Sequence, residues 1–318
     1  MGENESKFLI GDLAGLSEPM TKFIEVVSSA VGGIFKPHQK RRMAKATSDE
    51  IKTLSEAVKD IKGKVILKNG EWEINLDSES VEGRSLETLI AKEVKKQVNI
   101  ESIIYKAKDL IEEKKTVSKE EVNQDWITKF FNKAQDVSDE QMQNLWAKIL
   151  SDEIEKPKSY SLRTLELISN LSADEAKLIT EFCKYAFSYS KEVCIIGNMS
   201  LLDKYGIGAD EFVLLKDLGI AEFSTPSIFQ RFTISFKDYG NLRCGDILFQ
   251  IENVDKSNEV IITIIPFTTT GSEIYRLTAK GTELEYLKDV AGFVREENEK
   301  STVKIHITDL CNNQTQEL

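Results

Sequence analysis

A short basic segment is the first group of residues in this chain whose types and spacing could do chemistry. The sequence KPHQKRRMAK at positions 36–45 contains five cations, Lys36, Lys40, Arg41, Arg42 and Lys45. Cations at this density can bind the phosphates of nucleic acid or of lipid headgroups. The favoured interpretation is a solvated helical turn that pairs with the many carboxylates of the chain. Contact with nucleic acid or with an anionic membrane through residues 36–45 remains the alternative.

An acidic group, Asp152, Glu153 and Glu155, is the second candidate, because neighbouring carboxylates can hold Mg²⁺ or divide acid and base roles. These residues do not share one helix face, since facing positions lie three or four residues apart. Only Asp152 and Glu155 have that spacing. We therefore expect a structural ion pair between Glu153 and Arg163, on either side of a turn at Pro157.

Signatures of known catalytic and cofactor sites are absent from the sequence. His38 and His306 are the only histidines and lie far apart, which argues against a His-based zinc site or a catalytic triad. The sequence has no GxGxxG, GxxxxGK[ST] or GxSxG pattern. We predict no catalytic, cofactor-binding or metal-binding residues and no cofactor. Four widely spaced cysteines form no CxxC pair and are expected to be reduced thiols: Cys183, Cys194, Cys244 and Cys311.

The whole chain has the composition of an ordinary globular protein of 318 residues, long enough for two or three domains. Its net charge of −11 argues against non-specific binding of nucleic acid by the chain as a whole. The polar, acidic start MGENESKFLIGDL is unlike a signal peptide, and no apolar run reaches the roughly 18 residues of a spanning helix. We expect a cytoplasmic protein, with peripheral binding to the inner membrane as the alternative.

Helices dominate the predicted elements of the first 190 residues. Apolar residues recur at helical spacing over 20–35, and a polar helix is predicted over 38–61. Asn69-Gly70 predicts a β-hairpin over residues 64–76. Helical spacing then resumes with Leu86, Leu89, Ile90 and Val94, and again with Ile103, Ile104, Ala107, Leu110 and Ile111.

Residues 117–175 carry one helix-start pattern three times. A capping box is predicted at Ser118–Glu121, Ser138–Gln141 and Ser172–Glu175, with hydrophobic staples at Val117–Val122 and Val137–Met142. Two apolar stripes follow the first two boxes, and the second ends before Pro157. They contain Trp126, Phe130, Phe131 and Trp146, which could line a pocket, but their helical spacing favours core packing.

Beyond residue 190 the composition changes to mixed strands and helices. Strands are predicted at 194–197, 231–236, 246–251, 259–267 and 303–310, a helix at 210–220, and a strand leading into a Thr278-capped helix at 274–287. The last residues, NNQTQEL, are expected to fray. A helix followed by two strands resembles a winged-helix module, but Asp210, Glu211 and Asp217 make that helix acidic and favour protein over DNA as its partner.

The predicted fold is therefore a mainly α N-terminal helical domain followed by a smaller α+β, winged-helix-like C-terminal domain. We divide the chain into N-terminal amphipathic and basic helices (1–62), a helical core domain with a short β-hairpin (63–190), and the α+β domain (191–318).

Three segments of the helical region, NQDWITKFF, DVSDEQMQNLWAKILSDEI and SYSLRTLELISNLS, resemble an uncharacterised bacterial family, domain of unknown function 2806. The resemblance extends to GDLAGLSEPMTKFIEVVSSAVGGIFKPHQKRRMAKA and to the Leu-Thr-x-x-Gly segment at 277–281. The LWAKIL core is also similar to a helix of the abortive-infection alpha family. These resemblances imply a mainly helical fold and a bacterial setting close to phage defence, and they supply no catalytic residues.

The favoured function is a non-enzymatic interaction or scaffold protein, in phage defence or in a stress response, that binds a protein partner or itself as a homo-oligomer. One alternative is a membrane-active effector that uses residues 20–45. The other is a nucleic-acid-binding regulator that uses the 36–45 patch and the C-terminal module.

Overall fold

A computed structural model describes residues 16–30, 63–68, 71–76, 80–190, 192–222, 232–256, 258–278 and 281–318. The chain divides into two compact units, residues 1–159 and 160–318, and each is described by itself. This division places one boundary at Ser159, whereas the sequence suggested boundaries at 62 and 190. The basic segment 36–45 and the helix expected over 38–61 lie outside the described residues.

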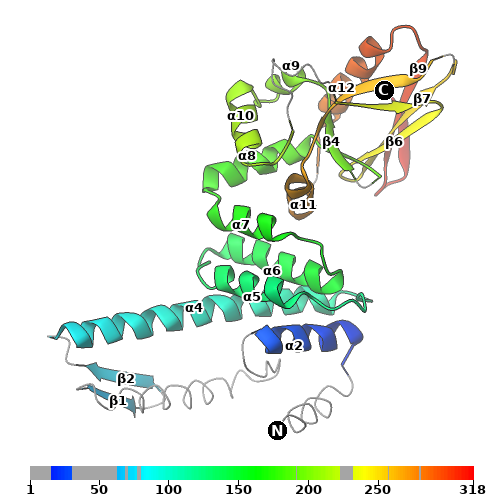
Figure 1. The fold of residues 1–318 in the computed structure, drawn as a ribbon. Coiled ribbons are helices and arrows are strands. Elements are labelled where there is room, and N and C mark those ends of the chain that lie inside the picture. The colour runs from blue at the N-terminus through cyan, green and yellow to red at the C-terminus, as the bar shows by residue number, and fades with distance from the viewer. Residues whose placement is uncertain are drawn as a thin grey trace. The chain divides into compact units, whose positions relative to one another are not determined.

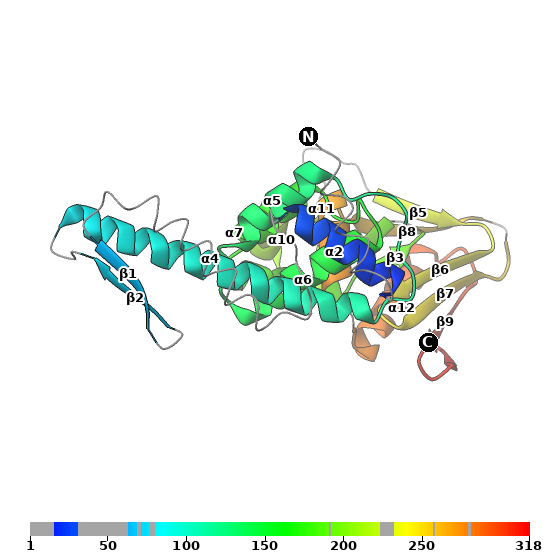
Figure 2. The same ribbon diagram turned by 90° about the horizontal axis from the view of Figure 1, so that it is seen from below.

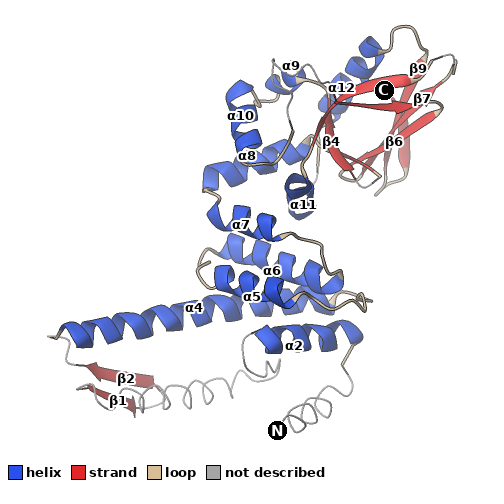
Figure 3. Cartoon of the chain, viewed as in Figure 1, coloured by secondary structure: helices blue, strands red, loops and turns tan. Residues whose placement is uncertain are grey.

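The first unit is built from four described helices and one hairpin (Figures 1 and 3). Helices α2 (Glu18–Ala30), α5 (Gln124–Ala134) and α6 (Glu140–Glu155) pack together with the C-terminal half of the 32-residue helix α4 (Val81–Glu112). Strands β1 (Gly63–Lys68) and β2 (Glu71–Leu76) pair antiparallel and lie beside the N-terminal half of α4 (Figures 1 and 2). Lys68 is paired with Glu71, so the hairpin predicted at Asn69-Gly70 is confirmed.

Aromatic side chains form the centre of this helical unit. The Phe130 ring lies 5.3 Å from that of Trp126 and 5.2 Å from that of Trp146, and Phe130 and Trp146 are fully buried. The interpretation of this stripe as core, rather than as a pocket lining, is confirmed. The apolar side of α2 is buried in the same unit through Met20, Phe23, Ile24 and Val27.

Two of the three predicted capping boxes are wrong. α5 begins after Asn123, whose side chain accepts a hydrogen bond from the N–H of Trp126 at 3.0 Å. α6 begins after Asp139, whose carboxylate accepts from the N–H of Met142 at 2.9 Å. Asn and Asp cap as well as Ser, and a carboxylate also gains from the helix dipole. The Ser118 hydroxyl instead accepts from the Glu120 N–H within a loop.

Only the third box stands as predicted, at the start of helix α8 (Ala173–Lys184) in the second unit. Ser172 accepts from the N–H of Glu175, and the Glu175 carboxylate accepts from the N–H of Ser172.

The second unit consists of an eight-stranded antiparallel sheet with helices packed around it (Figure 3). The strand order is β10-β9-β7-β6-β3-β4-β8-β5. The strands are β3 (Phe187–Tyr189), β4 (Glu192–Ile196), β5 (Phe232–Phe236), β6 (Tyr239–Cys244), β7 (Ile247–Asn253), β8 (Val260–Pro266), β9 (Val303–Asp309) and β10 (Gln314–Glu317). The remaining helices of this unit are α7 (Leu162–Asn170), α9 (Met199–Asp203), α10 (Ala209–Asp217), α11 (Thr269–Leu277) and α12 (Leu284–Glu297).

The predicted winged-helix-like C-terminal domain is wrong. The two strands assigned to the wing are not neighbours, since β5 pairs only with β8 at the sheet edge, whereas β7 pairs with β6 and β9. The second unit is also no smaller than the first, because each spans half of the chain. The sequence did not distinguish a winged-helix-like domain from an eight-stranded antiparallel sheet, because it indicates where strands lie but not which strands pair.

The sequence analysis also missed three strands of this unit, β3, β6 and β10, and misplaced one helix, α11. β3 has three residues, β6 contains Gly240 and Asn241, and β10 is a polar QTQE segment within the tail expected to fray. The strand expected from residue 274 is part of α11, which begins after Thr268. The Thr268 hydroxyl accepts from the N–H of Gly271 at 2.9 Å and caps α11. Thr278, the expected start of a helix, is instead where α11 ends, and the next helix, α12, begins after Glu283.

Candidate interaction surface

The N-terminal half of α4 is the candidate interaction surface. Ser80 caps this helix by accepting from the N–H of Gly83 at 3.0 Å, and good helix formers such as Glu, Lys and Leu follow. Leu89, Val94 and Val98 are 53%, 50% and 58% exposed. Residues spaced by four form a row along a helix, so Ile90, Val94 and Val98 line up along one side of α4.

The C-terminal half of the same helix behaves differently. Ile103, Ile104, Ala107 and Ile111 are buried against the other helices of the unit. α4 is therefore a core helix in its C-terminal half, whereas Leu89, Val94 and Val98 in its N-terminal half are exposed. Scattered exposed apolar residues are normal on a protein, but several on one side of one helix are typical of a contact surface.

The flanks of the exposed row carry both signs of charge. Glu87 and Lys95 are exposed on one side of the row, and Glu93 on the other side pairs with Lys96 at 2.9 Å. Cations alone, which a membrane or nucleic acid would favour, are therefore not what borders this row.

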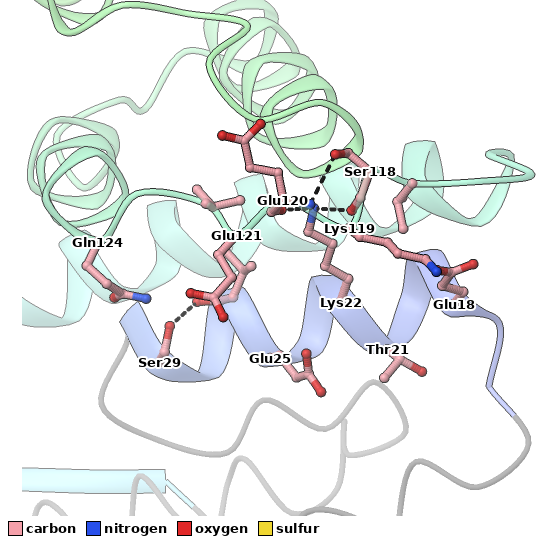
Figure 4. A pocket seen from close by; sticks show the side chains of 13 residues that line it. Glu18, Thr21, Lys22, Glu25, Ser29, Ser118, Lys119, Glu120, Glu121 and Gln124 are labelled. Atoms are coloured by element: carbon pink, nitrogen blue, oxygen red, sulfur yellow. Dashed lines mark hydrogen bonds between the residues drawn. The ribbon is translucent and has the colours of Figure 1, made fainter.

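A groove of about 650 Å³ lies between α2 and the loop at residues 117–124 (Figure 4). The Lys22 ammonium group reaches across it and donates to the carbonyl oxygens of Ser118 and Glu120, at 2.7 and 2.8 Å. Burial lowers the pKa of Lys22, and the negative charges of Glu120, Glu153 and Glu18 partly oppose this effect. Lys22 thus joins the loop to α2.

The groove is mainly acidic. Its charged lining comprises the carboxylates of Glu18, Glu25, Glu120 and Glu121 and the ammonium groups of Lys22 and Lys119. Such a lining could attract a cation or a basic side chain.

The predicted acidic group is held by a lysine. Lys114 lies 2.6 Å from the Glu155 carboxylate and 3.9 Å from that of Asp152, so these two residues share one cationic partner, as their spacing allowed. The buried Glu153 accepts from the N–H of Lys158 at 2.7 Å, just beyond Pro157. Arg163 belongs to the second unit, and its pairing with Glu153 stays a prediction. Lys36, Lys40, Arg41, Arg42 and Lys45 lie outside the described residues.

Glu273 is a buried polar residue of the second unit that the sequence did not single out. Its carboxylate accepts from the N–H of Ser161 at 2.7 Å and from the Thr164 hydroxyl. It thus joins α11 to the first turn of α7, where the helix dipole favours a negative charge. The sequence feature that could have identified Glu273 is the presence of a carboxylate among the apolar residues of α11.

The thiols divide into three buried groups and one exposed group. Burial raises the pKa of the Cys194 and Cys244 thiols to about 12, and Cys183 is also buried, whereas Cys311 is exposed. None of the four forms a disulfide bond. In the described ranges, no group of three or more His, Cys, Asp or Glu side chains is arranged to hold a metal ion. None of the helices described has the length and apolar content needed to cross a membrane.

Comparison with known proteins identifies one family model, described as a protein of unknown function (DUF2806), which matches residues 84–291. No curated protein and no solved structure matches the chain. The matched region begins near the start of α4, includes α5 and α6, and extends through most of the second unit. Because this match spans more than half of the 318 residues, the chain belongs to the DUF2806 family of proteins of unknown function.

Proposed function

We propose that this protein is a non-enzymatic interaction protein that binds a protein partner through the N-terminal half of α4. The observation that supports this function is the apolar row at Ile90, Val94 and Val98, in which Ile90 is partly buried and both valines are at least half exposed, on a helix whose other half is a core element. Helices that bind partners use apolar anchors at this spacing, bordered by charges that set orientation.

A partner that covers this row would remove its apolar side chains from water, which is favourable. Burying a valine or leucine side chain fully contributes about 1.5–3 kcal/mol relative to leaving it exposed. Leu89, Val94 and Val98 are each half exposed or more, so they would gain part of this free energy against a partner.

The two alternative functions draw on other parts of the chain. A membrane-active effector would need the apolar side of α2, but Met20, Phe23, Ile24 and Val27 are buried within the helical unit. A nucleic-acid-binding regulator would depend on residues 36–45 against a net charge of −11. The contact surface on α4 requires neither.

Native mass spectrometry of the gently purified protein tests the proposal. We expect a defined protein complex for the wild type and loss of that complex for the double variant Val94→Ser, Val98→Ser. Val213→Ser is the matched control, since Val213 is 61% exposed on α10 in the second unit. A wild-type monomer with no bound protein would contradict the proposal, as would turnover of nucleotide, ester or nucleic acid that a point substitution abolishes.

Phage defence in a bacterial host is the setting that we propose for this interaction, on the basis of the LWAKIL resemblance. Cells that produce the wild-type protein should then show a lower efficiency of plaque formation than cells that produce the Val94→Ser, Val98→Ser variant. Equal plaque formation across a panel of phages would remove this setting and would favour the stress-response alternative.

A further inference from the structure

We infer that the groove between α2 and residues 117–124 binds the basic segment of its own chain, residues 36–45, with Glu25 and Glu121 as the counter-ions. The groove is separate from the contact surface on α4, so this inference goes beyond the proposed function. It follows from the carboxylates that line the groove, from the end of α2, and from the position of the segment along the chain.

Glu25 and Glu121 are the two carboxylates of the groove that are open to a cation. Glu25 comes from α2 and Glu121 from the loop, both are exposed, and Figure 4 shows both carboxylates on the side of the groove away from the Lys22 ammonium group. Among the described residues, neither carboxylate has a hydrogen bond or an ion pair. Lys22 is engaged with two carbonyl oxygens, and Glu120 already pairs with Lys158.

The C-terminal end of α2 adds negative potential at the same end of the groove. Ser29, in the last turn of α2, lines the groove close to Glu121 (Figure 4). A helix C-terminus carries a partial negative charge that favours a nearby cation, but the last turn of α2 contains no basic residue. The first cation after Lys22 along the chain is Lys36, at the start of the basic segment. The segment therefore supplies the charge that this end of the groove lacks.

The basic segment starts within reach of the groove. Lys36 follows Ala30, the last residue of α2, by six positions, which span at most about 20 Å when fully extended. The 13 residues of α2 are themselves about 20 Å long, so the connection can reach the groove along its length. A short connection also gives the segment a high effective concentration at the groove, which a separate molecule does not have.

The side chains of the segment match the rest of the lining. Lysine and arginine pack their apolar stems on apolar surface and keep the charged end with an acid or with water. The groove offers Val26, Val117 and Val122 beside its carboxylates, in a volume of about 650 Å³. The same carboxylates would repel the phosphates of nucleic acid or of an anionic membrane. A basic segment of another molecule would have to compete with one that is tethered beside the groove.

Carbodiimide cross-linking of the full chain, which joins carboxylates to lysines that they contact, tests this inference. In a mixture of ordinary and ¹⁵N-labelled protein, we expect peptide mass spectrometry to find links from Glu25 or Glu121 to Lys36, Lys40 or Lys45 within single chains. Links that join the two isotopic forms would overturn binding within one chain and assign the segment to a second copy. The absence of links to Glu25 and Glu121 would overturn the site.

Limited proteolysis with trypsin gives an independent measurement, because a bound segment is cut slowly at its lysines and arginines. The double variant Glu25→Gln, Glu121→Gln should raise the rate of cleavage within residues 36–45 by about fivefold, since it removes both counter-ions. Glu140→Gln is the matched control, because Glu140 is an exposed carboxylate of the same unit outside the groove, and it should leave the rate unchanged. Far-ultraviolet circular dichroism checks that the variants keep their helix content. A rate that is equal in the double variant and the wild type would overturn the role of these two carboxylates.

Discussion

At the scale of single residues, the groups that could do chemistry are held in structural roles. Lys22 joins a loop to α2, Lys114 holds two carboxylates, and Glu273 joins two helices of the second unit. The Tyr205 hydroxyl donates to Asp289 at 3.1 Å, and burial is the main reason why its pKa is raised. Hydrogen bonds and ion pairs of this kind fix the position of each of these side chains and join the elements that carry them.

The cysteines give a first prediction at this scale. Thiolate is the reactive form of cysteine, and thiols with a pKa of about 12, such as Cys194 and Cys244, contain almost none at neutral pH. We expect iodoacetamide to modify Cys311 alone in the native protein and all four cysteines in denaturant, as measured by intact and peptide mass spectrometry. Modification of Cys194 or Cys244 in the native protein as fast as that of Cys311 would contradict the burial of these thiols.

A second prediction concerns the pH dependence of Cys311. The negative charge of Asp246 is the largest cause that raises the pKa of this thiol, so less thiolate is present at a given pH than in a free cysteine. Asp246→Asn should lower the pKa and move the pH–rate profile of alkylation to lower pH, so that Cys311 reacts faster near pH 8. Asp238→Asn is the control, because Asp238 pairs with Lys256 and is not among the groups that shift this pKa. An unchanged profile in Asp246→Asn would contradict this assignment.

At the scale of elements, the sequence predicted what depends on local pattern. The buried stripe of α5, the hairpin at 63–76 and the strands β4, β5, β7, β8 and β9 all have a clear period or a clear turn signal. β10 has neither, since its QTQE sequence is a strand only because the backbone of β9 pairs with it. The strand order could not be predicted and the winged-helix assignment was wrong for the same reason, because strand pairing depends on contacts between distant residues.

The exposure of the candidate surface on α4 likewise could not be predicted from the local sequence pattern. Leu89, Ile90 and Val94 follow helical spacing in the sequence just as Ile103 and Ile104 do. The sequence predicted helical spacing for both groups and gave no difference in burial between them. Only the packing of α2, α5 and α6 shows that Ile103 and Ile104 are covered, whereas Leu89 and Val94 are half exposed.

A third prediction uses two glycines in helices of the second unit. A Cβ at Gly271 in α11 would lie 1.9 Å from the Ile220 carbonyl oxygen, whereas a Cβ at Gly292 in α12 would meet nothing within 4 Å. Gly271→Ala should lower the free energy of unfolding by about 3 kcal/mol, because the backbone must move. Gly292→Ala should raise it by about 0.5–1 kcal/mol, because alanine loses less entropy in a helix. Denaturant unfolding measures both, and equal effects would contradict the close approach of α11 to Ile220.

At the scale of the whole molecule, the division into residues 1–159 and 160–318 governs how the chain should unfold. The first unit has an aromatic core around Phe130, and the second has the core of its sheet, with fully buried residues such as Phe249 and Tyr286. A unit with its own apolar core can unfold as its own cooperative transition.

Scanning calorimetry of three proteins tests this fourth prediction. We expect two transitions in the wild type. Phe130→Ala removes a fully buried ring from the first unit, which should cost about 3–5 kcal/mol, and should lower the midpoint of one transition only. Gly271→Ala should lower the midpoint of the other transition only, because its clash lies within the second unit. A single transition shifted by both variants would instead mean that the two cores unfold together. In that case a partner bound to α4 in the first unit would stabilise the sheet of the second as well, since ligand binding stabilises everything that unfolds in the same cooperative step.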